Sequence, residues 1–409
     1  MLGTKSPTEP GAANVTIEFK PCLREDGQGE RLATLGYTAS SAEAQMRLMA
    51  TLSRWMARNG HAAGDLTAAE GERFVAQRRE RRRTQFTSSK ALTPVLEYLR
   101  GLNVAPQPDA RILDTPVEQL LARYRRYLLS ERGLADGTVR YYTDMARLLL
   151  SQRAGAGGAL REMTAADVSD FVLSECRRRG PGSAGNLATA LRSLLRFLHL
   201  DGVIGAHLAA AVPTVAHWRG TGLPRALPPA QATMLLNSCD RDSDSGRRDY
   251  AMLLLLGRLG LRAGEVAALT LDDLNWWRGE VVIRGKGSRV DRLPMPSDVG
   301  EALASHLRLD RPSTGYRNVF LRLRAPHRPL SVGGVQAAVA AAAARAGVAE
   351  ASAHRLRHTA ATEMLRHGAR LTEIGQVLRH RDVATTALYA KVDHSTLQTL
   401  AKPWPGGAA

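Results

Sequence analysis

Four segments near the C-terminal end of the 409-residue chain carry side chains that can act together on a phosphate ester. Arginine guanidinium groups bind the nonbridging oxygens of a phosphate in a forked geometry. A tyrosine beside them can attack as a nucleophile and form a covalent phosphotyrosine, and a lysine on a mobile tip can protonate the leaving oxygen. The segments are LGLRAGE at 259–265, GKGS at 285–288, HRLRHT at 354–359, and LRH at 378–380 with Tyr389 nine residues later.

The chain has no carboxylate cluster that would hold Mg²⁺ and no Gly-rich phosphate loop followed by Lys and Ser or Thr. Positive side chains are therefore expected to do the work of a metal ion, with no metal and no cofactor. His354 and His358 have a spacing that can bind zinc on a helix, but Arg355 occupies the place of the glutamate in H-E-x-x-H. We interpret His358 as a buried structural histidine, and Glu265 as a structural partner of its neighbours.

In this order, the residues resemble the signature of the tyrosine recombinase (phage integrase) family, Arg…Lys…His-x-x-Arg…His…Tyr. The matching positions are Arg262, Lys286, His354, Arg357, His380 and Tyr389. The resemblance implies a site-specific DNA recombinase that cuts and rejoins DNA through a 3′-phosphotyrosyl intermediate, for integration, excision or transposition of a mobile element.

The resemblance also implies a role for each matching residue. Tyr389 would attack the scissile phosphate while Arg262 and Arg357 clamp it. The two histidines would support the transition state, and Lys286 would be the general acid. Glu265 and His358 are expected to be supporting residues.

Two positions depart from the family's pattern. Arg379 replaces the usual glycine of the L-G-H box, and Arg355 stands where aspartate is frequent. Both add positive charge, so they are candidate DNA-binding residues, although a single sequence does not identify the residues that read bases.

The composition favours a polyanionic partner. Lys+Arg is 56 and Asp+Glu is 39, which gives a formal charge of +17. No apolar run is long enough for a membrane helix, the first ten residues lack the apolar core of a signal peptide, and three distant cysteines form no disulfide or zinc pattern. We therefore expect a cytoplasmic protein that associates with the nucleoid when bound to DNA and has no membrane partner.

Hydrophobic spacing and proline-rich stretches divide the chain into six parts. The predicted parts are a flexible N-terminal arm (1–31), an additional helical DNA-binding-like domain (32–108), a core-binding helical domain (112–212), a linker (213–229), the catalytic domain (230–400) and a disordered tail (401–409). The two helical blocks share a pattern at an offset of 97 residues, for example Phe74 with Phe171 and Thr67 with Thr164. This offset predicts a duplicated domain, although small helical bundles can share such patterns without common origin.

The expected fold is multidomain and mainly α. One or two SAM-like helical domains would precede a mixed α/β catalytic domain. Strands at 280–284 and 290–295 would form its small antiparallel sheet. By resemblance, the domains would form a C-clamp around double-stranded DNA with specific core sites. Four copies would assemble transiently on two sites, with accessory or co-recombinase proteins as further partners.

Two other functions use the same features. A type IB topoisomerase-like or hairpin-end resolving enzyme would share the chemistry but give relaxed circles or closed ends. A DNA-binding protein with a decayed site would bind without covalent chemistry. The basic run at 78–83 (RRERRR) is either a phosphate-tracking patch or a solvated helix end.

Overall fold

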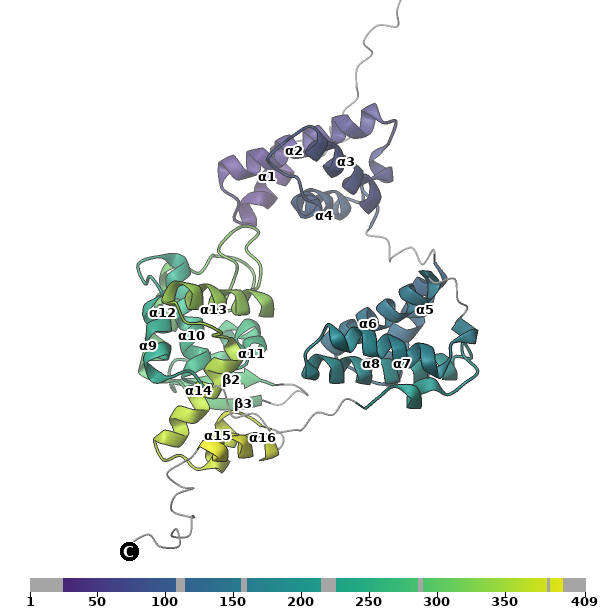
Figure 1. Ribbon diagram of the computed structural model, residues 1–409. Coiled ribbons are helices and arrows are strands. Elements are labelled where there is room, and N and C mark those ends of the chain that lie inside the picture. Colours follow the sequence, from purple (N-terminus) through teal and green to yellow (C-terminus); the bar gives the residue numbers. More distant parts are fainter. Residues whose placement is uncertain are drawn as a thin grey trace, which may run out of the picture. The chain divides into compact units, whose positions relative to one another are not determined.

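The protein is mostly helical, with one small sheet (Figure 1). The computed structural model describes residues 25–107, 115–155, 160–214, 226–285, 290–380 and 383–392. Contacts between Cα atoms divide the chain into two compact units, one with residues 64–70 and 105–221 and the other with the remainder. Lys286 and the predicted tail at 401–409 lie outside the described residues, as does most of the predicted linker. No helix in the described ranges is long and apolar enough to cross a membrane.

The N-terminal block is entirely helical. Its elements are α1 (Glu25–Thr34), α2 (Ala39–Arg58), η1 (Ala63–Asp65), α3 (Ala68–Glu80), η2 (Ser89–Leu92) and α4 (Thr93–Gly101). Helix α1 begins inside the segment for which a flexible arm was predicted, and its Leu32 is 2% exposed. The burial of this leucine shows why the residues just before position 32 are helical, although their polar sequence has no sustained apolar period.

The second block is also helical and repeats the middle part of this arrangement. Its elements are α5 (Pro116–Arg126), η3 (Tyr127–Glu131), α6 (Asp136–Gly155), η4 (Leu160–Glu162), α7 (Ala165–Arg177), α8 (Pro181–Leu200) and η5 (Leu208–Ala211). Helices α2 and α6 have the same length and boundaries 97 residues apart, and so do α3 and α7. The hydroxyls of Thr67 and Thr164 each accept a backbone N–H three residues later at 3.3 Å. A duplication would produce this constant offset.

The C-terminal block is the mixed α/β part. Its elements are α9 (Pro229–Asn237), α10 (Asp244–Gly257), α11 (Ala263–Ala268), η6 (Leu271–Asp273), β1 (Leu274–Asn275), β2 (Glu280–Arg284), β3 (Val290–Pro294), α12 (Ser297–Leu309), α13 (Val332–Ala346), α14 (Ala353–Arg366), α15 (Leu371–Val377), α16 (Val383–Ala387) and η7 (Leu388–Val392). The antiparallel pair β2–β3 confirms the predicted strands, with Arg284 opposite Val290, and the short β1 adds a third strand that the sequence did not indicate.

Helix α10 is the centre of the main apolar core of this block. Its six consecutive residues from Ala251 to Leu256 are at most 1% exposed, and it packs against both α12 and α14. All-round burial explains the run of apolar residues without a helical stripe. The end of α10 leads directly to Leu259–Glu265, so this core fixes the place of Arg262.

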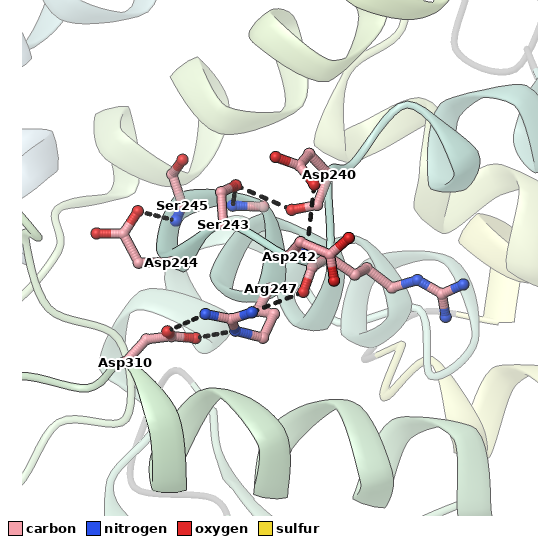
Figure 2. A network of polar contacts seen from close by, with 9 residues as sticks. Asp240, Asp242, Ser243, Asp244, Ser245, Arg247 and Asp310 are labelled. Atoms are coloured by element: carbon pink, nitrogen blue, oxygen red, sulfur yellow. Dashed lines mark hydrogen bonds and ion pairs between the residues drawn. The ribbon is translucent and has the colours of Figure 1, made fainter.

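A polar network holds the start of α10 (Figure 2). Ser243 caps the helix by accepting the N–H of Gly246 at 3.1 Å and donates to the carbonyl of Asp240 at 2.9 Å. Arg247 makes two 2.6 Å bonds to the carboxylate of Asp310, just after α12. A Cβ on Gly246 would lie 1.7 Å from the Asp240 carbonyl oxygen, so only glycine fits there. The network therefore fixes α10 to α12 at the end distant in sequence from Arg262.

Candidate active site

Helix α14 carries four of the predicted site residues, and three of them share one face. Ser352 caps the helix by accepting the N–H of Arg355 at 3.2 Å. Positions 354, 357 and 358 are three and four residues apart, so they share one face of the helix. On this face, Nε2 of His354 lies 3.0 Å from Nε2 of His358, and the two rings meet edge to face.

Arg357 is one of two buried arginines in the site. The residue is 4% exposed, and its guanidinium donates to the backbone carbonyls of Gly260 and Leu378. Burial and the nearby charges of Arg262 and Arg379 lower the pKa of Arg357 to about 10, so it stays charged at neutral pH. These two bonds connect α14 to the loop before Arg262 and to the end of α15.

Gly260 allows the loop before Arg262 to pack closely against Leu378 and Arg357. Its φ is +59°, and a Cβ at this position would lie 2.5 Å from Cδ2 of Leu378. Glycine thus satisfies both the left-handed backbone and the tight contact, and its carbonyl turns toward Arg357.

Glu265 joins two arginines. Its carboxylate accepts the backbone N–H of Arg262 at 2.8 Å, the Arg262 guanidinium at 2.7 Å and the Arg379 guanidinium at 2.7 Å. Burial alone would raise the pKa of Glu265, but the Arg262 N–H and the charges of both arginines outweigh it and lower the pKa. The Arg262 side chain remains 47% exposed, so the carboxylate holds it in place without covering it.

Arg379 does not face solvent, contrary to the prediction that it is a DNA-contact candidate. Its side chain is 3% exposed, and its guanidinium bonds Glu265 and, at 2.7 Å, the carbonyl of Val377. Its φ is +56°, the left-handed backbone for which a glycine is the usual choice. The arginine therefore occupies a glycine-type turn and directs its charge inward, where Glu265 neutralises it.

Arg355, the other candidate DNA-binding residue, bonds the loop that precedes α14. Its guanidinium bonds the backbone carbonyl of Glu350 at 3.2 Å and lies 3.6 Å from that residue's carboxylate. The side chain is 20% exposed. A DNA contact by Arg355 stays a prediction.

Tyr389 lies against α14 in the short helix η7. Its hydroxyl is 2.8 Å from Nδ1 of His358, and its ring is parallel to that of His380 at 6.4 Å. His380 in turn bonds the hydroxyl of Thr386, also at 2.8 Å. The structure thus brings together five of the six predicted catalytic residues, while Lys286 lies outside the described residues.

The hydrogen bonds of Tyr389, His358 and His354 are consistent with one set of tautomers. If Nδ1 of His358 accepts the tyrosine O–H, its Nε2 carries the proton and donates to Nε2 of His354. Burial and the neighbouring charges of His354 and Arg357 lower the pKa of His358 to about 4, so the imidazole is neutral and Nδ1 is free to accept the hydrogen bond of the tyrosine. The sequence analysis expected His358 to be a structural, supporting residue and did not predict its contact with Tyr389.

The Tyr389 side chain is buried and its hydroxyl is protonated at neutral pH. The residue is 2% exposed within a small apolar cluster that also includes Ile374 and Leu378, and burial raises the pKa of its hydroxyl. This apolar cluster is separate from the main core around α10.

The Glu265–Arg379 pair gives a stability prediction. Glu265→Ala leaves the Arg379 charge buried without its partner, which should lower the free energy of unfolding by about 3–5 kcal/mol. Arg379→Gly should cost clearly less, because glycine relieves the left-handed backbone and Glu265 keeps both bonds from Arg262. Urea unfolding measures both variants, and an equal or larger loss for Arg379→Gly would contradict this account.

Solved structures of DNA recombinases share this fold. XerH bound to a difH substrate aligns with a TM-score of 0.52 at 17% identity, over 71% of this chain and 97% of that one. A lambda integrase tetramer bound to a Holliday junction aligns with a TM-score of 0.52 at 16% identity, over 75% of this chain and 87% of that one. The fold is therefore that of the tyrosine recombinases.

Sequence comparison identifies the family. The Phage integrase family profile matches residues 225–396. A protein of Sinorhizobium fredii named as an integrase/recombinase, y4rA, is 41% identical over 384 residues, 93% of each chain. The tyrosine recombinase XerD of Xanthomonas campestris pv. campestris is 32% identical over 69% of this chain and 90% of its own. The chain belongs to the phage integrase family of tyrosine recombinases, enzymes that break and rejoin DNA.

Proposed function

We propose that this protein recombines DNA at specific sites through a covalent link between Tyr389 and a 3′ phosphate, in the movement of a mobile element. The observation that carries the proposal is the hydrogen bond between the Tyr389 hydroxyl and His358, beside Arg357 and His380. A nucleophile, a neutral base and fixed positive charge are the parts that this chemistry needs.

In the first step, the tyrosine oxygen bonds to the scissile phosphorus and the bond to the 5′ oxygen breaks. The phenol proton passes to Nδ1 of His358, whose Nε2–H bond to His354 stabilises the imidazolium that forms. His354 is exposed, so a proton relayed through it reaches solvent. Lys286 supplies a proton to the leaving 5′ oxygen.

Two arginines are assigned to the phosphate. Arg262 offers a half-exposed guanidinium held by Glu265. Arg357 provides a second, buried positive charge with a fixed position. His380 supports the transition state from the tyrosine side, with its orientation set by Thr386. The 5′-hydroxyl of a partner strand then attacks the phosphotyrosine and reverses the step, so no ATP is consumed.

We further propose that the helical and catalytic domains form a clamp on duplex DNA in the cytoplasm, and that four copies exchange strands between two core sites through a Holliday junction. The lambda integrase tetramer on a Holliday junction and the transposon integrase of Tn1549 on a circular-intermediate DNA support this assembly by similarity of fold. Accessory or co-recombinase proteins would act at this stage.

The product of the reaction distinguishes the proposal from its alternatives. Purified protein is incubated with two labelled duplexes taken from the DNA that flanks its own gene. Exchanged strands of recombinant length are expected. Relaxed circles or closed hairpin ends without exchange would instead indicate a topoisomerase-like or end-resolving enzyme, and protection of the DNA without any broken strand would indicate a binding protein.

A further inference from the structure

The N-terminal block has a cleft that the active site does not use. It has a volume of about 420 Å³ and lies between α2, α3 and the loop at 81–86. Six arginines contribute to its lining, and none of the lining residues is acidic. The arginines are Arg47, Arg54, Arg58, Arg78, Arg81 and Arg83. We refer to these six residues and the space between them as the arginine cleft.

The fold does not require these arginines. Helices α6 and α7 repeat α2 and α3 at an offset of 97 residues, so each arginine on α2 and α3 has a structural counterpart. The counterparts of Arg47, Arg54, Arg58 and Arg78 are Asp144, Ser151, Gly155 and Glu175. The same helices therefore form without this charge. Arg47 pairs with Glu43 one turn earlier on α2, and the other arginines of the cleft need another explanation.

The cleft also places several positive charges, and buried hydrogen-bond donors without acceptors in the described part of the chain, close together, which is unfavourable for the folded state. Burial and the nearby charge of Arg83 lower the pKa of Arg78. Nε of Arg78 and Nε1 of Trp55, both on cleft-lining residues, are buried without a hydrogen-bond acceptor among the described residues. A buried donor without an acceptor is unfavourable, and an anion in the cleft would satisfy both the donors and the charge.

The loop that closes the cleft is held in a strained shape. Arg82 and Phe86 have φ values of +52° and +54°, which are unfavourable for residues with bulky side chains. Bonds from Arg78 to the Gln85 carbonyl at 3.0 Å and from Arg79 to the Thr87 carbonyl at 2.7 Å hold this loop in place. Arg81 and Arg83 are thereby presented beside the arginines of α2.

We infer that the arginine cleft binds the phosphate backbone of duplex DNA outside the catalytic site. Forked guanidinium groups match phosphate oxygens, and a protein of this family is already at its DNA when it acts. The inference extends the proposed function, but it concerns contacts that are independent of base sequence and of covalent chemistry. Of the two interpretations of the basic run at 78–83, the inference favours phosphate tracking, since Arg78, Arg81 and Arg83 of this run line the cleft.

The test measures binding of the full chain to a labelled random-sequence duplex over a range of salt concentrations. Arg54→Gln/Arg58→Gln removes two exposed arginines of the cleft, at helix positions that glutamine tolerates. Each lost phosphate contact removes about 0.9 from the slope of log K against log salt, so the slope should become shallower by about 2. The loss should be the same for every DNA sequence.

The matched control is Arg308→Gln/Arg366→Gln, which removes the same charge from two exposed arginines of α12 and α14. Its slope should equal that of the wild type. A wild-type slope in the cleft variant, or an equal change in both variants, would overturn the inference. Covalent adducts of the wild-type protein are scored separately. Their absence together with a shallower slope in the cleft variant alone would refute the proposed function and leave the cleft inference standing.

Discussion

Replacing Tyr389 with phenylalanine is expected to abolish covalent DNA adducts while leaving DNA binding unchanged. The substitution removes the hydroxyl that lies 2.8 Å from Nδ1 of His358 and keeps the ring within its apolar cluster. No other hydroxyl takes over the hydrogen bond to His358 in the described structure. The measurement is the yield of SDS-resistant adducts on nicked duplexes, from which the released strand diffuses away.

A matched control separates this effect from general damage. Tyr316→Phe makes the same change at a tyrosine that is 41% exposed and is not part of the site. Its adduct yield should equal that of the wild type. Adducts formed by Tyr389→Phe at the wild-type position would show that another group is the nucleophile.

Replacing His358 with asparagine is expected to lower the cleavage rate by about 10², the low end of the usual contribution of a general base, because the lowered pKa makes this imidazole a weak base. The asparagine side chain can still accept a hydrogen bond from Tyr389, but it does not take a proton near neutral pH. Because burial raises the pKa of the tyrosine hydroxyl, fewer than about one molecule in a thousand has an ionised Tyr389 at pH 7 without a base. Single-turnover cleavage of a nicked duplex measures the rate.

The pH dependence distinguishes a base from a residue that only positions the tyrosine. The pKa of His358 is about 4, so the wild-type imidazole is neutral above that value, and protonation of His358 should not lower the rate between pH 6 and 9. The rate of His358→Asn should rise about tenfold per pH unit over that range, because it depends on the small ionised fraction of Tyr389. A constant ratio between the two proteins at every pH would contradict the role of His358 as a base.

Much of the site could be predicted from sequence because its parts are local. The spacing of His354, Arg357 and His358 places them on one face of a helix whatever the rest of the chain does. The glycines around Lys286 and the β-branched residues beside them predict the hairpin, whose strands the structure confirms. The boundaries of α2 and α6, and those of α3 and α7, follow the offset of 97 residues found in the sequence.

The contacts that adjust the chemistry could not be predicted, because each joins segments that are distant in sequence. Tyr389 reaches His358 across 31 positions, and Arg379 reaches Glu265 across 114. The sequence shows that Arg379 adds a charge where glycine is usual. Only the structure shows that this charge is directed to the buried carboxylate of Glu265 and not to the surface. The arginine cleft likewise depends on how α2, α3 and a strained loop come together.

The most direct test of the central claim is to identify the residue that becomes linked to DNA. Wild-type protein is trapped on nicked duplexes from the DNA flanking its gene, the DNA is digested with nuclease, and the modified peptide is sequenced by mass spectrometry. The chain has nine tyrosines, and the account predicts a nucleotide on Tyr389 alone. A nucleotide on any other residue would contradict the assignment of the nucleophile and, with it, the role of the His358–Tyr389 hydrogen bond.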